Sequence, residues 1–145
     1  MSTNQERSSG FSLLELLIVV SIILVIATIA IPSLLRSRQS AQESSAVAQL
    51  RTINTAEVTY IGNNQGSYGD IPSLITQGLL DSRFVNSISG YNFTIAVSGN
   101  IYTALGTAVS TNAGRWDYFT TGDYVLRYAT DPTRAPAGLS GEPVR

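Results

Sequence analysis

One uninterrupted apolar segment limits what this chain can become more than any other feature of its sequence. No charged residue occurs from Leu16 to Leu35, and only three hydroxyl-bearing residues and Pro32 interrupt the aliphatic side chains. As a helix, these 20 residues span about 30 Å, the thickness of the hydrocarbon core of a bilayer. Aliphatic side chains surround such a helix on all sides, so lipid or other protein must cover it.

Three interpretations compete for this segment. A cleaved secretory signal has a shorter apolar region and rarely contains an acid such as Glu15, although Thr28-Ile29-Ala30 is similar to a small-x-small cleavage site. An ordinary single-pass membrane anchor fits the length and the composition. The third interpretation depends on the residues that come just before the segment.

Residues 1–10, MSTNQERSSG, are polar and end in Gly10, and Phe11 and Ser12-Leu13-Leu14-Glu15 follow directly. This junction resembles the processing site of type IV prepilins and the related pseudopilins. In that family a membrane-embedded aspartic peptidase removes a short hydrophilic leader after its last glycine, and the new N-terminal residue, most often Phe, is N-methylated. The resemblance implies cleavage between Gly10 and Phe11 and N-methylation of Phe11.

The family motifs cover about residues 10–35, whereas the family architecture covers the whole chain. The leader departs from many family leaders because its one basic residue, Arg7, is balanced by Glu6. A second departure is that the chain has no Cys and cannot close the C-terminal disulfide loop of many pilins.

Glu15 and Pro32 are the two unusual residues of the apolar segment. Ser12-x-x-Glu15 matches a capping box, and an acid in the first turn favours the helix dipole. The resemblance implies a second role for Glu15, an assembly salt bridge to the α-amine of Phe11 on a neighbouring subunit.

Pro32 leaves the carbonyl of Thr28 without its helical partner, so a kink or local melting of the helix is expected there. The family often has a proline at this place.

The apolar half of the helix, residues 11–35, is expected to continue as an amphipathic half at residues 36–61. Four side chains fall on one face of that half at helical spacing: Ala46, Leu50, Ile53 and Tyr60. Glu57 lies on the same stripe and is interpreted as a solvated rim residue, with a buried acid paired to an Arg as the alternative. Residues 62–66 contain two Gly and two Asn, which predict the end of the helix.

Residues 62–129 are expected to form a head with a roughly four-stranded antiparallel sheet. Asp70 and Pro72 predict the start of a short helix over residues 70–80. The alternation of apolar and polar residues from Tyr91 predicts a strand, and Gly99-Asn100 predicts a two-residue turn into its partner strand. The other predicted strands are residues 101–106, 115–120 and 124–128. The fold class is α+β and pilin-like, with a loose tail at residues 130–145.

The composition excludes several kinds of chemistry. The chain has no Cys and no His, so a thiolate nucleophile, a Cys/His zinc site and a Ser-His-Asp triad are impossible. Nine Arg, ten acids and no Lys give a net charge of −1, which argues against nucleic-acid binding. Asp117, Asp123 and Asp131 are conceivable calcium ligands, but roles in turns fit their spacing better. We expect no enzyme activity, no cofactor and no metal.

The sequence therefore predicts a structural protein, the major subunit of a type IV pilus. Its expected partners are other copies of itself in a helical homopolymer, the prepilin peptidase/methyltransferase, inner-membrane assembly machinery and the lipid bilayer. The chain would lie in the inner membrane before assembly and in an extracellular pilus afterwards. Two alternatives stay open: a major pseudopilin of a type II secretion system, and a membrane-anchored binding domain that never polymerises. The sequence does not distinguish cell adhesion from twitching or DNA uptake.

Overall fold

The structure is a computed structural model that describes residues 10–128 and 141–144. The chain divides into two compact units between Arg36 and Ser37. One long helix, α1 (Leu13–Asn63), supplies residues to both units. This helix includes both of the halves predicted from the sequence and ends two residues later than expected.

The described part of the first unit consists mainly of the N-terminal portion of α1. In the isolated chain the side chains of residues 16–35 are exposed, apart from the half-buried Ala27. By length and composition α1 is able to cross a membrane, and none of its most apolar stretch is buried inside the protein. Helix α1 continues without a break through Pro32, so the local melting expected there is absent, while a kink stays a prediction.

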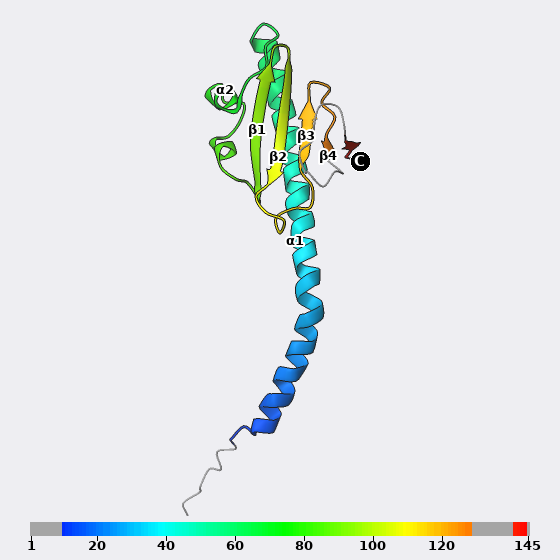
Figure 1. The fold of residues 1–145 in the computed structure, drawn as a ribbon. Helices are drawn as coiled ribbons and strands as arrows, with labels where there is room; N and C mark the ends of the chain where they lie inside the picture. Colours follow the sequence, from blue (N-terminus) through cyan, green and yellow to red (C-terminus); the bar gives the residue numbers. More distant parts are fainter. Residues whose placement is uncertain (1–9, 129–140, 145) are drawn as a thin grey trace, which may run out of the picture. The chain divides into compact units, whose positions relative to one another are not determined.

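The second unit packs the C-terminal portion of α1 against an antiparallel sheet (Figure 1). The strands lie in chain order across the sheet, and every neighbouring pair is antiparallel. Their bounds are β1 (Tyr91–Ser98), β2 (Ile101–Ala108), β3 (Tyr118–Thr121), β4 (Arg127–Tyr128) and β5 (Glu142–Pro143). The α+β, pilin-like fold class predicted from the sequence is confirmed.

Two features of the sheet differ from the sequence-based expectation. The predicted tail contributes the short strand β5, which pairs with β4 through Arg127↔Pro143 and Tyr128↔Glu142, so the sheet has five strands instead of about four. Strand β3 begins at Tyr118 and β4 at Arg127, each three residues after the predicted start. Tail residues 130–140 and 145, together with residue 129 of the head, lie outside the described residues. The β1–β2 hairpin follows the prediction, with Gly99 at the left-handed φ of +58° that this turn requires.

The core lies between α1 and the inward side chains of the sheet. Ala46, Leu50 and Ile53 of α1 are all nearly or fully buried, as their helical spacing predicted. Opposite them, Phe93 of β1 packs over Gly106 of β2, where an added Cβ would lie 3.1 Å from the Phe93 ring. The missing side chain at Gly106 makes room for the aromatic ring. Close packing of this kind gives the head a hydrophobic core of its own.

Two short helices connect α1 to the sheet. Helix α2 (Ile71–Thr76) begins at the N-cap Asp70, whose carboxylate accepts a hydrogen bond from the backbone N–H of Ser73 at 3.0 Å. The predicted start of this helix is therefore confirmed, although it ends earlier than residue 80. The 3-10 helix η1 (Ser82–Val85) begins in the same way, because Asp81 accepts a hydrogen bond from the N–H of Arg83 at 2.8 Å.

The interpretation of Glu57 as a solvated rim residue is wrong. Its side chain is fully buried, and Oε2 accepts a hydrogen bond from the backbone N–H of Gly69 at 3.1 Å. The alternative of a buried acid paired to an Arg is also wrong, since neither of the two ion pairs among residues 10–128 and 141–144 includes Glu57. The error arose because the loop that covers this end of α1 carries no apolar pattern that the sequence could reveal.

A pair of glycine substitutions tests how closely the head packs around the buried Tyr91. At Gly114 an added Cβ would clash with the hydroxyl of the buried Tyr91, whereas at Gly62 it would meet nothing within 4 Å. We expect Gly114→Ala to lower the free energy of unfolding by about 1–3 kcal/mol. Gly62→Ala, in the last turn of α1, should change it little or raise it by up to about 1 kcal/mol. Denaturation of the detergent-solubilised chain, followed by the fluorescence of its single tryptophan, Trp116, measures both. Equal effects of the two substitutions would contradict the close approach of Gly114 to Tyr91.

Candidate functional site

The N-terminal end of α1 is organised by the predicted capping box. The Oγ of Ser12 accepts a hydrogen bond from the N–H of Leu14 at 3.3 Å, and Oε2 of Glu15 accepts one from the N–H of Ser12 at 2.9 Å. These bonds satisfy two of the backbone donors that a helix leaves unpaired at its start. The negative charge of Glu15 also lies beside the positive end of the helix dipole. The fold therefore explains how this acid is tolerated next to an apolar surface.

Gly10 and Phe11 precede the helix and make no comparable contribution to the fold. Phe11 is 76% exposed, and a Cβ added to Gly10 would meet no atom within 4 Å. Gly10 is also absent from the residues with a positive φ, so its backbone does not require glycine. The contacts of the described residues thus give no structural reason for either residue type at these two positions.

The polar residues inside the apolar stretch bond to the helix itself. The hydroxyl of Ser21 donates to the carbonyl of Leu17 at 2.7 Å, and that of Thr28 donates to the carbonyl of Val25 at 2.7 Å. Both donors are therefore satisfied without water. The exposed surface of residues 16–35 is consequently suited to an environment of lipid or of other apolar helices.

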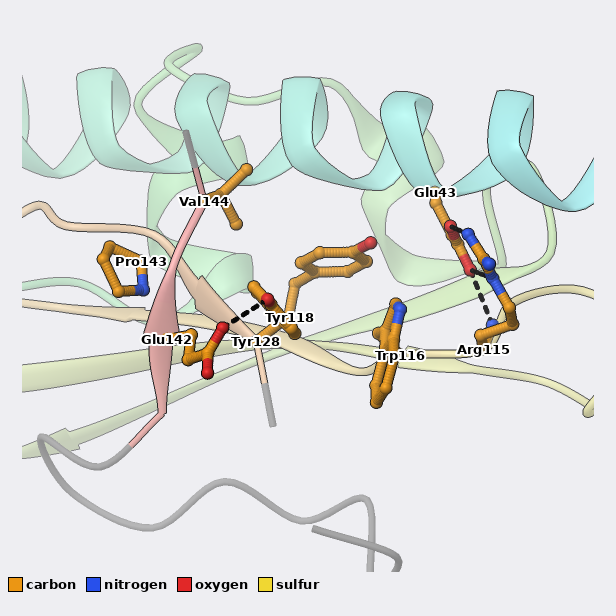
Figure 2. Close-up of a pocket in the computed structure, with 8 residues that line it drawn as sticks. All are labelled: Glu43, Arg115, Trp116, Tyr118, Tyr128, Glu142, Pro143 and Val144. Carbon is orange, nitrogen blue, oxygen red and sulfur yellow. Dashed lines mark hydrogen bonds and ion pairs between the residues drawn. The ribbon is translucent and has the colours of Figure 1, made fainter. Parts of the chain in front are cut away.

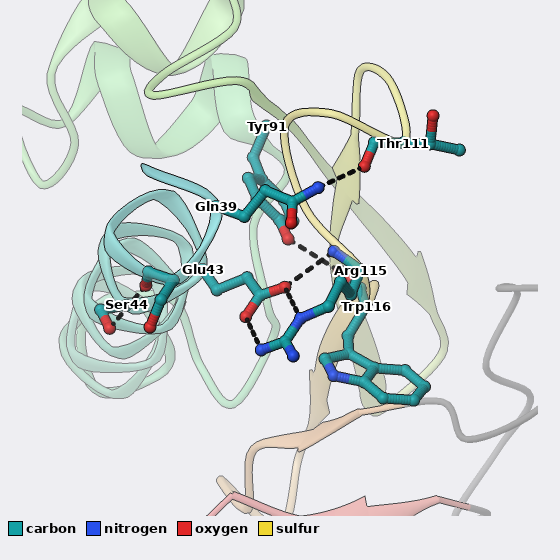
Figure 3. A network of polar contacts seen from close by, with 8 residues as sticks. Gln39, Glu43, Ser44, Tyr91, Thr111, Arg115 and Trp116 are labelled. Carbon is teal, nitrogen blue, oxygen red and sulfur yellow. Dashed lines mark hydrogen bonds and ion pairs between the residues drawn. The ribbon is translucent and has the colours of Figure 1, made fainter. Parts of the chain in front are cut away.

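A second polar site joins α1 to the loop between β2 and β3, and the sequence analysis missed it. The buried carboxylate of Glu43 accepts three hydrogen bonds from Arg115: from its backbone N–H at 2.7 Å, Nε at 3.3 Å and Nη2 at 3.1 Å (Figure 3). Gln39, one turn earlier, donates to the carbonyl of Thr111 at 2.8 Å. The two helix residues fasten this loop to α1. Because 72 residues separate each pair along the chain, no local pattern could have indicated it.

The Glu43–Arg115 pair lies at one end of an open groove of about 700 Å³ (Figure 2). Aromatic rings from β3, β4 and the segment before β3 line it, with the rings of Trp116 and Tyr128 5.5 Å apart. The hydroxyl of Tyr128 donates to Glu142 of β5 at 2.7 Å. This groove is a surface feature that the sequence analysis also did not predict.

The aspartates weighed as calcium ligands take part in hydrogen bonds of the fold. Asp117 accepts one from the N–H of Ala108 at 2.9 Å. Asp123 accepts bonds from the N–H of Val125 at 3.1 Å and from Arg127, which forms an ion pair with it at 2.6 Å. The hydrogen bonds from Arg127 lower the pKa of Asp123 to about 2. Asp131 lies outside the described residues, and the described ones hold no group of three or more possible metal ligands.

Comparison with known proteins points to the same N-terminal region. Residues 6–31 match the family described as the prokaryotic N-terminal methylation motif. Over 75 residues, 52% of this chain, the sequence is 35% identical to the type IV major pilin protein PilA of Myxococcus xanthus. Over 74 residues, 51% of this chain, it is 35% identical to the type IV wide pilus major component PilA4 of Thermus thermophilus. These alignments cover 34% and 56% of the two relatives, respectively.

The structure places the matched methylation motif at the start of an exposed apolar helix that leads into an α+β, pilin-like head. The two relatives that the chain matches are both named as major components of type IV pili, and the matches cover only part of each relative. The chain thus carries an N-terminal methylation motif and is similar to type IV major pilins over about half of its length.

The contact between Glu43 and Arg115 yields a prediction about stability. Glu43→Ala should lower the free energy of unfolding by about 1–3 kcal/mol, because it leaves the backbone N–H of Arg115 without its acceptor. Glu43→Gln keeps an acceptor oxygen and should cost less. Ser44→Ala is the matched control, since the exposed Ser44 hydroxyl bonds to the carbonyl of Ser40 on its own helix. Trp116 fluorescence reports all three unfolding curves. If the Glu43→Ala chain is as stable as the Ser44→Ala chain, the assignment is contradicted.

Proposed function

We propose that this chain is a structural, non-enzymatic subunit of a type IV pilus, and specifically its major pilin. The observation that carries the proposal is the exposed, uncharged surface of residues 16–35 directly behind the methylation motif. Such a surface is stable in a bilayer as a monomer and in a bundle of identical helices as a polymer. The names of both relatives, each a major pilus component, support this role over that of a pseudopilin.

The proposed maturation begins with cleavage between Gly10 and Phe11. A prepilin peptidase would remove residues 1–10 at the membrane surface and free the α-amine of Phe11, which would then be N-methylated. The absence of a structural need for glycine at position 10 supports a role in recognition by the peptidase. The subunit would stay in the inner membrane through its apolar helix until inner-membrane assembly machinery extracts it into an extracellular filament.

In the filament, Glu15 is proposed to pair with the α-amine of Phe11 on a neighbouring subunit. The carboxylate of Glu15 is exposed, and its hydrogen bond from the N–H of Ser12 uses Oε2. An ion pair among apolar helices is sensitive to the loss of either partner, because the remaining charge is left without compensation. This sensitivity would fix the axial register between subunits. Pro32 is proposed to soften α1 where the helices pack tightly.

Cleavage is tested by Gly10→Val. The new side chain has open space around it, so the chain should fold and insert normally while the leader of residues 1–10 stays attached. An immunoblot of membranes should show the longer precursor, whereas Ser8→Ala should give a band of mature length. A mature-length band from the Gly10→Val chain would contradict the proposed site.

The assembly role of Glu15 is separated from its capping role by two substitutions. Glu15→Val removes both the charge and the capping bond, whereas Glu15→Gln keeps a capping acceptor and loses the charge. Both variants should be inserted and cleaved, and both should reduce the number of sheared filaments by about tenfold or more, as the loss of one partner of an ion pair predicts. If the Glu15→Gln chain assembles as well as the natural chain, Glu15 acts through capping alone and the proposed salt bridge is wrong.

A further inference from the structure

Glu57 is a buried acid that the proposed filament role does not use. Its side chain is fully buried, yet it receives one hydrogen bond, from the N–H of Gly69 to Oε2 at 3.1 Å. The other oxygen, Oε1, is buried and has no hydrogen-bond partner among the residues that the structure describes. A buried, ionised carboxylate without further hydrogen bonds or a cation is expensive, so the neutral form suits this environment much better.

Within residues 10–128 and 141–144, the groups that act on the charge of Glu57 offer no positive charge. Asp70 adds a negative charge near Glu57. Hydrogen bonds from Ser73 lower the pKa of Asp70 and keep it ionised. From the sheet and its loops the titratable neighbours are Tyr102 of β2 and Tyr124, which follows β3. Burial raises the pKa of Tyr102, and a hydrogen bond with Tyr68 raises the pKa of Tyr124 to about 12. Both tyrosines therefore stay neutral at ordinary pH.

The single hydrogen bond of Glu57 holds a loop that contacts several parts of the head. We define this loop as residues 64–70. Gly69 lies against the ring of Tyr60 of α1, where an added Cβ would be 3.0 Å from the ring. Tyr68, in the same loop, packs its ring 4.7 Å from that of Tyr102, and its hydroxyl is 3.3 Å from that of Tyr124. Movement at Gly69 would therefore disturb contacts with both α1 and the sheet.

We propose that Glu57 is a pH-dependent latch: its protonated carboxyl keeps residues 64–70 closed against α1, and its ionisation loosens this loop. Protonation gives Oε1 or Oε2 a hydrogen and removes the buried charge, while the remaining acceptor keeps the bond from Gly69. Ionisation creates a charge that water must reach, and in this proposal the loop, whose Gly69 N–H contacts the carboxyl, moves to admit the water. This device uses none of the residues assigned to the N-terminal site.

The direction of the pH dependence follows from the environment of the carboxyl. Burial is the largest influence on Glu57 and raises its pKa above the ordinary 4.5, while the N–H of Gly69 opposes this and the charge of Asp70 reinforces it. Because the folded state binds this proton more tightly, the contribution to stability is full below the ordinary pKa and is lost as pH rises through the folded value. The low pKa of Asp123, about 2, places its titration well below this window.

Hydrogen exchange of the detergent-solubilised full chain tests the latch. Exchange into peptides that contain residues 64–70, corrected for the intrinsic rate, is measured from about pH 5 to about pH 8. Protection of the loop in the natural chain should fall several-fold across this range, by at most about tenfold per pH unit. Glu57→Gln keeps an acceptor for Gly69 and cannot ionise, so its protection should not depend on pH. Glu142→Gln, a change at an exposed acid of β5, should keep the pH dependence of the natural chain.

Each result decides the proposal. Constant protection in the natural chain would overturn it, and so would a pH dependence that persists after Glu57→Gln. If the Glu57→Gln chain fails to fold, infrared spectroscopy of the natural chain with isotope-labelled glutamate gives the answer. A carbonyl band of a protonated glutamic acid that disappears as the loop loses protection supports the latch. If that band is absent throughout the range, the proposal is wrong.

Discussion

The apolar surface of residues 16–35 must be covered by something other than this chain, and the rest of the structure is consistent with that constraint. Nearly all of these side chains are exposed in the isolated protein, and the hydroxyls of Ser21 and Thr28 bond to carbonyls of their own helix. The charge that directly precedes this surface, on Glu15, is held at the helix start by the capping box. The head has a separate core built on Leu50, Ile53 and the aromatic residues of the sheet. It therefore does not require this surface for its own packing.

The division between structural and functional requirements is sharpest at the N-terminal end of α1. Ser12 and Glu15 have a clear structural role, because each satisfies a backbone N–H at the start of the helix. Gly10 and Phe11 have none among the described contacts, yet they lie within the matched methylation motif. Residues that a fold does not need but that a motif contains are the best candidates for recognition by another protein. This contrast supports the assignment of Gly10 and Phe11 to processing.

Patterns that act over a few residues could be predicted from the sequence. The capping box at Ser12, the N-cap at Asp70 and the turn at Gly99 depend on neighbours within four positions, and the structure contains all three. The spacing of Leu50 and Ile53 likewise indicated the buried face of α1, because helical periodicity is a local property.

Contacts between distant segments could not be predicted in the same way. Glu43 bonds to a residue 72 positions away, and β5 pairs with a strand 14 positions earlier, so neither leaves a local signature. Glu57 was misinterpreted for the same reason, since its burial depends on a polar loop that folds back over α1. Single-sequence periodicity assigned Glu57 to the correct helix face and then failed on its environment. Such buried acids are where the structure adds most to the sequence.

The central claim is that the chain functions from Phe11 onward as a processed, polymerising subunit. Intact-mass and N-terminal analysis of the protein isolated from sheared surface filaments of its native cells tests this most directly. The account predicts a single species that begins with N-methylated Phe11. A surface or membrane protein that retains residues 1–10, or one that begins after Ala30 as a secretory signal would leave it, would contradict the account.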